Sequence, residues 1–541
     1  MHRIKGYLAS WVMLSSLTCP MSAKDVVTVR FDGAKVKVSA VKPTDSVQIS
    51  QNGASVMVEN LAKTQPLTIR LSGTSDDGQL VLKTSTKDKI ELDNLTLQSK
   101  HGAPIWIKNK KKVEVVALGK TTNNLTVAAC PDTATQKAAV IYAKDKLQLS
   151  GKGRLTCLAS GDGCKGIQSK KDITIEDVAL DVKTTGNNLG KKEDGFGFSG
   201  PMGGPPMGGP GMGPGGFGLG GPDFNFDDLP EEVKQRIEEM RKRFENGEFP
   251  EMGGPGGYGG FGFGGPGPGF GGPGFGGPGG PGGFGMAGPP EGEGPEDAND
   301  GGGFKQKYIS TCKGIKTLGK VTIQSGSVTV YTSSAGAEGI EGKKGVIING
   351  GMVDVNAKDD AINANAAICF NGGKTKAISR DNDAVDANPE GGFFPPFFGG
   401  NDEGRETPEP LIFIAGGEVL AYSWKGGPEE GLDCDFNPIE VSGGTAFSIG
   451  AGMGEMPSVP TVETAKQPTA LLVGMNVVKG KNITLKDARG KVLFTTSAPF
   501  SYNNSSSILT CPAMKVGESY TVECGDWRKE FRMEEKFMVV R

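Results

Sequence analysis

The most regular feature of the chain is a set of short apolar runs that return about every 22 to 23 residues in its second half. Each repeat starts with a small residue before a branched one, as in Gly339-Ile340, Ala361-Ile362 and Ala384-Val385. A run of three residues with apolar ends follows, then a bend that usually contains glycine, then a second alternating run. The other starts are Gly166-Ile167, Gly314-Ile315 and Gly431-Leu432, the last delayed by residues 389–410. This pattern predicts two or three short strands in each repeat.

Strands of three or four residues cannot bury an apolar face alone, but stacked copies can form a continuous apolar interior. A period of 22 to 23 residues without helical spacing excludes the helical repeat families. A propeller blade needs a longer repeat of about 40 residues. The prediction is therefore an all-β solenoid, a parallel β-helix, and the general rule for parallel crossovers makes it right-handed.

Similar alternation on both sides of these repeats extends the prediction. Apolar and polar residues alternate over residues 80–97, and further runs lie at 105–107, 113–115, 140–142 and 147–149. We expect residues 24–190 to hold an N-terminal cap and the first rungs, and residues 306–456 the C-terminal rungs. Residues 457–541 also alternate strongly and are expected to form a small β cap that covers the last open edge.

Residues 191–305 differ in kind, because they are dominated by glycine, proline, phenylalanine and methionine. Such a low-complexity chain cannot bury enough surface to offset its ordering entropy. One helix is predicted near residues 228–246, where acidic residues come early and basic residues late. The segment is expected to loop out between two rungs, either as a flexible contact arm or as a tolerated insertion.

The first 23 residues have the features of a signal peptide: basic residues, an apolar run over 7–17, and a small residue, Ala23, at the expected cleavage point. The apolar run is too short for a membrane span, and no later segment qualifies. The prediction is a secreted or cell-surface protein without a transmembrane segment. A lipid anchor at Cys19 is an alternative, to which Thr18 is poorly suited.

The charge, histidine and cysteine content limit the kinds of binding site and cross-link that the chain can have. The net charge of −3 gives no electrostatic reason to expect nucleic acid binding, and two histidines exclude a histidine-rich metal site. Export permits disulfides. Cys511 with Cys524, and Cys157 with Cys164, are candidate pairs.

Stacking turns sequence spacing into columns of side chains. The residue before each repeat start forms what we name the leading column: Lys165, Lys313, Glu338, Asp360, Asp383 and Glu430. The residue two past each start forms the following column, which includes Glu341, Asn363, Asp386 and Asp433. Asp359, Asp381 and Asp435 add nearby oxygens. The columns are therefore acidic in their C-terminal part.

Carboxylates on neighbouring rungs, about 4.8 Å apart, repel by roughly 3 kcal/mol at an effective dielectric near 20. They need a counter-charge, a raised pKa or an outward splay. Calcium supplies the first, because it takes about 6–8 oxygen ligands in loose geometry. The eleven acidic and asparagine residues just named are thus candidate calcium ligands. The alternative is that Asp and Asn occur there because they suit bends.

Several of these rungs resemble a known family. Residues 338–351 and 359–364, together with upstream residues 71–80, 103–109 and 139–145, are similar to the bacterial carbohydrate-binding β-helix family related in fold to pectate lyases. The resemblance implies a right-handed β-helix, bound calcium, and affinity for acidic or plant-cell-wall polysaccharide. The family's Asp-Gly-Ile start appears here with Glu338 or with alanine after the acid, and lysine precedes the two earlier starts. Calcium is therefore expected only in the C-terminal half.

The leading functional hypothesis is a non-catalytic polysaccharide-binding protein. Tyr422 and Trp424 lie two apart, so on a strand both point to one face, either toward a sugar or into a core. The competing hypothesis is a calcium-dependent polysaccharide lyase in which Arg380 or Lys358 is the base. A third is a structural or adhesive surface protein whose working part is the glycine-rich segment.

Overall fold

The computed structural model describes residues 12–13, 26–40, 46–131, 137–191, 308–388, 409–425, 428–435, 437–450 and 458–541. The regular elements among these residues are all β-strands. The described part of the chain therefore contains no helix that is long and apolar enough to cross a membrane. The predicted helix near 228–246 lies outside the described residues. So does the predicted signal peptide, except for β1 (Val12–Met13), which pairs with β4 (Val47–Asn52).

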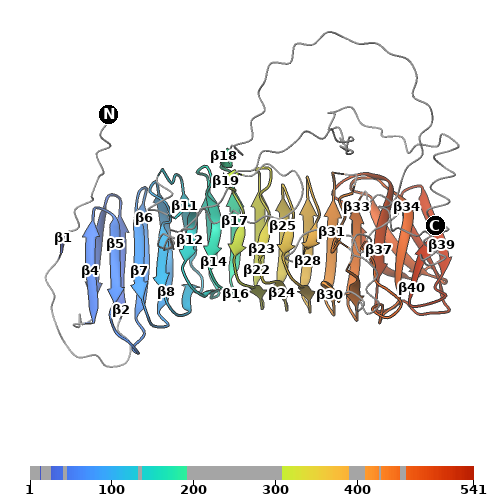
Figure 1. Cartoon of the computed structure of the whole chain (residues 1–541), viewed down its shortest axis with the longest axis horizontal. Coiled ribbons are helices and arrows are strands. Elements are labelled where there is room, and N and C mark those ends of the chain that lie inside the picture. The colour runs from blue at the N-terminus through green and yellow to red at the C-terminus, as the bar shows by residue number, and fades with distance from the viewer. Residues whose placement is uncertain are drawn as a thin grey trace, which may run out of the picture. The chain divides into compact units, whose positions relative to one another are not determined.

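A rung consists of three strands separated by bends, and each strand pairs in parallel with its copy in the next rung. One rung is β23 (Ile340–Gly342), β24 (Val346–Ile348) and β25 (Met352–Ala357). The next is β26 (Ile362–Ala364), β27 (Ile368–Phe370) and β28 (Lys374–Ser379). Strands of successive rungs stand side by side (Figure 1). Long parallel sheets of this kind are consistent with a parallel β-helix.

Three parallel ladders run through the rungs. The first contains β5 (Ser55–Asn60), β7 (Gln79–Thr84), β9 (Ile105–Asn109), β12 (Ala139–Ala143), β15 (Lys165–Ser169), β20 (Ile315–Thr317), β23, β26 and β29 (Val385–Ala387). The second contains β8 (Lys89–Ser99), β10 (Val113–Ala117), β13 (Leu147–Ser150), β16 (Ile173–Glu176), β21 (Val321–Ile323), β24, β27, β30 (Ile412–Ile414) and β32 (Ile439–Val441). The third continues from β8 through β11 (Thr122–Val127), β14 (Arg154–Ala159), β17 (Ala179–Thr184), β22 (Ser327–Thr332), β25, β28, β31 (Glu418–Ser423) and β33 (Thr445–Gly450). The predicted apolar runs of residues 105–107, 113–115, 140–142 and 147–149 all lie on these strands.

The interior is built from the apolar residues that alternate along the strands. In β25, Val353 and Val355 are buried while Met352 and Asp354 are exposed. The paired register places valine and isoleucine above one another, so the apolar side chains form one continuous core. The bends between the second and third strands carry glycines with positive φ, which are Gly326, Gly351, Gly373, Gly417 and Gly444.

The rungs on either side of the glycine-rich segment pair directly with each other. Strands β15, β16 and β17 lie beside β20, β21 and β22 in parallel register. The two ends of the segment meet in an antiparallel pair between β18 (Leu189–Lys191) and β19 (Tyr308–Ser310). The stack therefore continues past the segment, as the sequence predicted.

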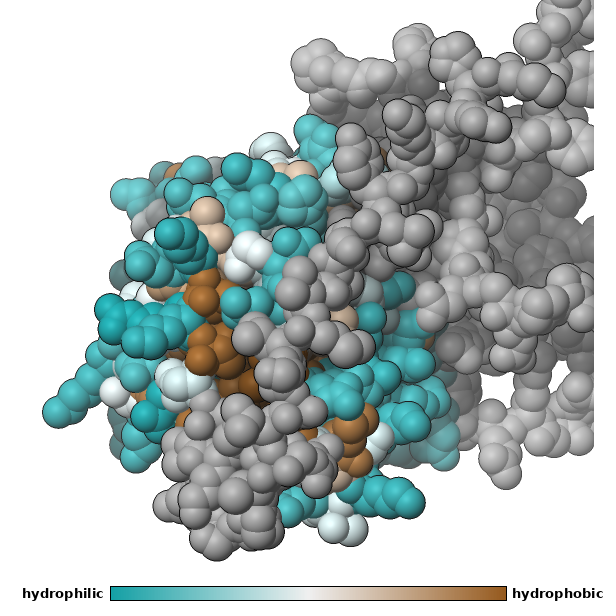
Figure 2. All heavy atoms as spheres, turned by 90° about the vertical axis from the view of Figure 1, so that its left-hand side faces the viewer, coloured by the Kyte–Doolittle hydropathy of each residue, from teal (hydrophilic) through white to brown (hydrophobic). Residues whose placement is uncertain are grey.

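Both ends of the stack change from parallel to antiparallel pairing. At the N-terminal end, β2 (Val26–Asp32) pairs with β3 (Lys35–Ala40), and β4 pairs with β5. Figure 2 looks at this end and shows hydrophobic side chains in its middle with hydrophilic ones around them. Four partly buried residues pack there against the core: Val36, Val38, Val47 and Ile49.

At the C-terminal end, β33 pairs antiparallel with β37 (Tyr502–Thr510). Strand β37 also pairs with β34 (Thr469–Val477), which has β40 (Phe537–Val540) on its other edge. A separate four-stranded sheet has the order β36 (Val492–Ser497), β35 (Asn482–Asp487), β38 (Ser519–Cys524) and β39 (Trp527–Arg532). Its apolar residues share a second core with the outer face of β31 and β33.

The candidate disulfide pairs are not bonded in the structure. Cys511 and Cys524 are both buried thiols. Cys157 stands in register with Leu125 and Val182 in the interior column of the third ladder, so it packs as a small apolar residue. Cys164, before β15, is a buried thiol as well.

Candidate functional site

The predicted columns exist, because the first ladder holds the repeat starts in strict register. Ile315, Ile340, Ile362 and Val385 are consecutive partners. The following column is therefore paired directly, in the order Lys316, Glu341, Asn363, Asp386 and Asp433. The leading-column residue stands three positions before the following-column residue of its own rung, which places Lys313, Glu338, Asp360, Asp383 and Glu430 in one line.

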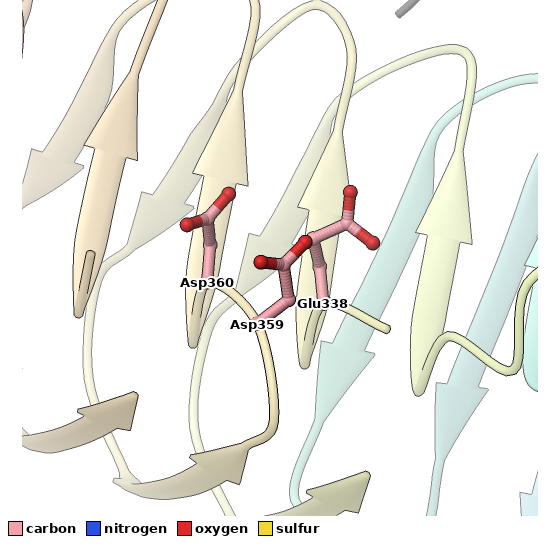
Figure 3. A group of neighbouring side chains, drawn as sticks. All are labelled: Glu338, Asp359 and Asp360. Atoms are coloured by element: carbon pink, nitrogen blue, oxygen red, sulfur yellow. The ribbon is translucent and has the colours of Figure 1, made fainter. Parts of the chain in front are cut away.

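The acids at the centre of the columns are buried. Glu341 is 0% exposed, Asp360 1% and Asp386 2%. In Figure 3 the carboxyl group of Asp359 lies between those of Glu338 and Asp360, which come from adjacent rungs. Burial decides against the alternative that these side chains splay into water.

Two groups of three carboxyls are close enough to share one ion. The first is Glu338, Asp359 and Asp360, and the second is Asp360, Asp383 and Asp386. In each group one oxygen from every residue lies within 4.8 Å of the others. Asp360 belongs to both groups, so it joins them into one line of acids along the stack.

Lysines neutralise the N-terminal end of this line. Lys313 Nζ lies 2.9 Å from Glu338 Oε1 and 2.9 Å from Glu341 Oε2. Lys343 Nζ lies 2.6 Å from Glu341 Oε1, and Lys316 Nζ lies 3.7 Å from Glu341 Oε2. Burial opposes ionisation of Glu341, but the three lysines outweigh it and hold the pKa of its carboxyl well below its usual value. Of the predicted ligands, Glu341 thus has the largest number of ion pairs with the protein's own lysines among the described residues.

The C-terminal end of the line has a different set of contacts. Among the described residues, no lysine or arginine forms an ion pair with Asp383, Glu430 or Asp433. Their oxygens instead accept hydrogen bonds from neutral groups, including the Glu430 backbone N–H to Asp383 Oδ1. Ser458 donates from its backbone to Glu430 Oε2 and from its hydroxyl to Asp433 Oδ1, both at 2.9 Å.

Amide side chains bridge the carboxyls between rungs. Asn363 Nδ2 donates to Asp360 Oδ2 at 3.1 Å and to Asp386 Oδ2 at 2.9 Å. Asn388 Nδ2 also donates to Asp386 Oδ2, at 2.7 Å. These amides fix the carboxyl orientations and carry no charge of their own.

The acids at the C-terminal end of the line have raised pKa values, with burial as the largest cause. Burial, followed by the neighbouring Asp433 and Asp360, raises the pKa of Asp383 well above its usual value. Burial and then Asp433 raise the pKa of Glu430 to about 9 and that of Asp435 to about 6. Burial also raises the pKa of Asp433. At neutral pH a pKa of about 9 keeps most Glu430 carboxyls protonated, whereas a pKa of about 6 leaves most Asp435 carboxyls ionised.

The donor set determines which cations fit. Every side chain in the two groups offers carboxylate oxygen, and the bridging residues add amide oxygens, with no imidazole or thiolate among them. Hard cations such as calcium and magnesium prefer this set, whereas zinc favours nitrogen and sulfur. The residues present thus fit a hard divalent cation.

The residues predicted as alternative catalytic bases are engaged elsewhere. Lys358 Nζ forms a 2.7 Å ion pair with Asp381 Oδ2, so Asp381 is held outside the two carboxyl groups. Arg380 donates from Nε to the Ala357 carbonyl at 3.0 Å, and its guanidinium stacks 4.9 Å from the centre of the Tyr331 ring. Both side chains thus have structural contacts.

The two predicted sugar-binding aromatics have opposite environments. Tyr422 is fully buried, and its hydroxyl lies 2.8 Å from Thr496 Oγ1 on β36, so no sugar can reach its ring. The packing of the four-stranded sheet on the outer face of β31 causes this. Trp424 is 53% exposed and stacks on Phe500 with ring centroids 5.2 Å apart.

Two features of the site were missed from the sequence. Ser458 lies after the last repeat, where no periodic signal marks it. The reach of Lys313 into the next rung was also missed, although its place in the leading column could have indicated it.

Comparisons with known proteins give one consistent description. The family model "Carbohydrate-binding domain-containing protein" matches residues 52–196 and 300–384, and so passes over most of the glycine-rich segment. A protein of that description from Acetivibrio thermocellus is 30% identical over 138 residues, which are 24% of this chain and 48% of the relative. The chain thus spans about half the length of this relative.

A solved structure, of the polysaccharide lyase-like protein from C. thermocellum as a gadolinium derivative, aligns with 68% of this chain and 94% of its own. The TM-score is 0.37 and the sequence identity 18%. Over residues 52–196 and 300–384, the chain is similar to carbohydrate-binding domain-containing proteins.

Proposed function

We propose that this protein is exported, binds an acidic polysaccharide without cleaving it, and holds calcium among the acids of its C-terminal rungs. The similarity to carbohydrate-binding domain-containing proteins supports the part of the proposal that concerns polysaccharide binding. The same proposal includes a right-handed solenoid and a capping role for residues 457–541. The buried group of Asp360, Asp383 and Asp386 is the observation that carries the calcium part.

Calcium suits this group because its three carboxyls are buried together and offer only oxygen, the ligand atom that this ion prefers. Asp360, Asp383 and Asp386 would hold the ion, with Asp433 and Glu430 continuing the line. A bound calcium ion would supply positive charge that attracts the carboxylates of a uronic acid polymer. The chain's part is to fix the acids in register, which the Asn363 bridges do.

Trp424 is the proposed apolar contact for a sugar ring. It is exposed, and its stacking on Phe500 fixes the orientation of the indole before any ligand arrives. A rigid aromatic face loses little entropy on binding a sugar. Tyr422 has no place in this contact.

The test compares wild type with the double variant that carries both Asp360→Ala and Asp383→Ala. Wild type should be retained on immobilised polygalacturonate with calcium and released by chelator, and calcium should raise its melting temperature. An ion bound only by the folded state adds about 2.7 kcal/mol of stability at a hundredfold excess over its Kd. The double variant should lose both effects, while Asp354→Ala, at an exposed position of β25, should keep them. An unchanged calcium response in the double variant would place the ion elsewhere.

The same incubation separates binding from cleavage. Because Lys358 and Arg380 are both engaged in structural contacts, absorbance of unsaturated uronides should stay constant with time. Growth of that absorbance in wild type, abolished in Arg380→Ala or Lys358→Ala, would replace this proposal with a lyase.

A further inference from the structure

The bends between the first and second strands of the N-terminal rungs are rich in lysine. They lie in residues 83–88, 108–112, 144–146 and 170–172, which together hold ten lysines, three aspartates and no arginine. The corresponding residues 364–367 of the C-terminal rungs include no lysine. Positive charge is therefore concentrated on one edge of the N-terminal half of the stack.

One lysine of each bend falls into a column. Lys83 of β7 and Lys108 of β9 are direct partners in the first ladder. The backbone N–H groups of Lys144 and Lys170 donate to the preceding rung in the same register. Neighbouring strands lie about 4.8 Å apart, so these four residues repeat at that interval along the stack. We name them the lysine column.

A second line of lysines runs along the other side of the bends. Lys87, Lys112 and Lys146 stand in matching register just before strands of the second ladder. Lys110 and Lys111 lie between the two lines and are exposed. The lysine column and these five residues form one surface, which we name the lysine strip.

The lysine strip carries more positive charge than the neighbouring acids offset. Lys83 Nζ lies 2.7 Å from Glu59 Oε1, and Lys146 Nζ lies 2.8 Å from Asp172 Oδ2. Among the described residues, no acid forms an ion pair with three exposed lysines of the strip, which are Lys110, Lys111 and Lys144. The strip therefore attracts anions from solution.

Lys108 combines this charge with an aromatic ring. Its Nζ lies 3.9 Å from the centre of the ring of Trp106, a partly exposed residue. Burial, followed by the neighbouring Lys83 and Lys137, lowers the pKa of Lys108, so the lysines repel one another here. A sugar acid suits both groups, because its carboxylate pairs with an ammonium and its C–H face packs on an aromatic ring.

The spacing and composition of the strip favour one class of anionic polymer. An extended uronic acid polymer carries one carboxylate on each sugar ring, and successive rings are spaced about as far apart as the rungs. Lysine meets a carboxylate as a point charge, whereas recognition of nucleic acid phosphates favours arginine, which the four bends lack. The strip therefore suits a polyuronate that lies along the stack better than a nucleic acid.

We propose that the lysine strip is a second contact surface for a uronic acid polymer, independent of calcium. The inference rests on the acidic polysaccharide of the proposed function and assigns a surface for it in the N-terminal rungs. Because salt screens exposed charges, the lysines alone hold the polymer only at low ionic strength. At physiological salt the calcium contact is needed as well.

The two contacts lie along one ladder. Trp106 aligns through the paired register with Lys316 of the following column. Lys108 lies two residues after Trp106 on β9, so the lysine column and the following column share one face of the first ladder. One polymer chain along this face meets ammonium groups in the N-terminal rungs and calcium in the C-terminal rungs.

The test measures the Kd of a soluble oligogalacturonate, long enough to span four rungs, in chelator at low ionic strength. The strip variant carries Lys110→Gln, Lys111→Gln and Lys144→Gln. Its control loses the same charge at three exposed lysines near the C-terminus, through Lys479→Gln, Lys481→Gln and Lys491→Gln. All of these side chains are exposed, so both variants should melt like wild type.

The strip variant should bind the oligomer about tenfold more weakly than wild type, the combined effect of three exposed ion pairs. The control should bind like wild type. Added salt should weaken binding by wild type more steeply than binding by the strip variant. With the methyl-esterified oligomer, which has the same sugar backbone without charge, the three proteins should no longer differ.

Four outcomes would overturn the lysine strip. The first is equal weakening of the strip variant and its control, which would show a general effect of net charge. The second is single-stranded DNA of equal charge binding wild type more tightly than the oligomer does, with loss in the strip variant, which would make nucleic acid the partner. The third is wild type that binds in calcium but not in chelator at low salt, and the fourth is a strip variant that binds like wild type. Wild type that binds no oligogalacturonate in either condition would instead remove the proposed function itself.

Discussion

The carboxyl groups of Asp383 and Glu430 make the stability of the fold depend on pH. Their pKa values are raised in the folded protein, that of Glu430 to about 9, by burial and by the acids beside them. A group with a raised pKa takes up a proton on folding over the interval between its unfolded and folded pKa. In this interval the folded state is therefore favoured by low pH.

The resulting prediction concerns the cation-free protein. In chelator, its free energy of unfolding should fall as pH rises from about 5 to about 9, because Glu430 and Asp383 must ionise inside the fold. Urea denaturation at pH 5, 7 and 9 measures this. Glu430→Gln should flatten the dependence, and calcium should reduce it. Stability that rises across this range in chelator would contradict the raised pKa values.

At the residue scale, the sequence predicted which side chains align along the stack better than it predicted what each side chain contacts. A fixed repeat length sufficed to align Asp360, Asp383 and Asp386, because register depends on periodicity alone. Burial of Tyr422 could not be foreseen, because it depends on a sheet formed from residues far along the chain. Long-range packing of this kind leaves no local pattern.

Among the elements, the bends show why glycine recurs. Gly373 has φ of +76°, and a Cβ there would stand 2.4 Å from the Gly351 carbonyl oxygen of the rung below. Glycine is therefore required at this bend for two reasons: the backbone is left-handed, and the stacked bends leave no space for a side chain. Strand bounds were predictable because apolar runs and glycine bends alternate. The four-stranded sheet order of β35 to β39 was not, because alternation indicates a strand without indicating its partner.

A pair of glycine variants separates the effect of the left-handed backbone from the effect of the missing space. Gly517 also has positive φ, +88°, but a Cβ there would meet nothing within 4 Å. Gly517→Ala should therefore cost only the backbone term, about 1–2 kcal/mol. Gly373→Ala should cost clearly more, since the clash with Gly351 is added. Chemical denaturation measures both, and equal losses would show that the stacked bends can move apart.

For the whole molecule, the paired ends of the glycine-rich segment allow it to be removed cleanly. Lys191 and Tyr308 are direct partners in the β18–β19 pair. A two-residue Asn-Gly turn suits the junction between two such strands. Replacing residues 192–307 by Asn-Gly should leave the melting temperature within a few degrees, because the rung pairings on both sides persist. Loss of a single cooperative transition would show that the segment supports the stack.

That junction also sets an order of events during folding. Asp177 and Ser325, which are hydrogen-bonded across it, are 148 residues apart, whereas Gln324 and Asn349 on the next pair of rungs are separated by 25. The entropy of closing the longer loop adds about 1.5 kcal/mol to the first contact across the junction. The N-terminal rungs can assemble while the C-terminal rungs still await this closure. The slow step of assembly therefore lies in the middle of the stack, and the shortened chain should refold faster.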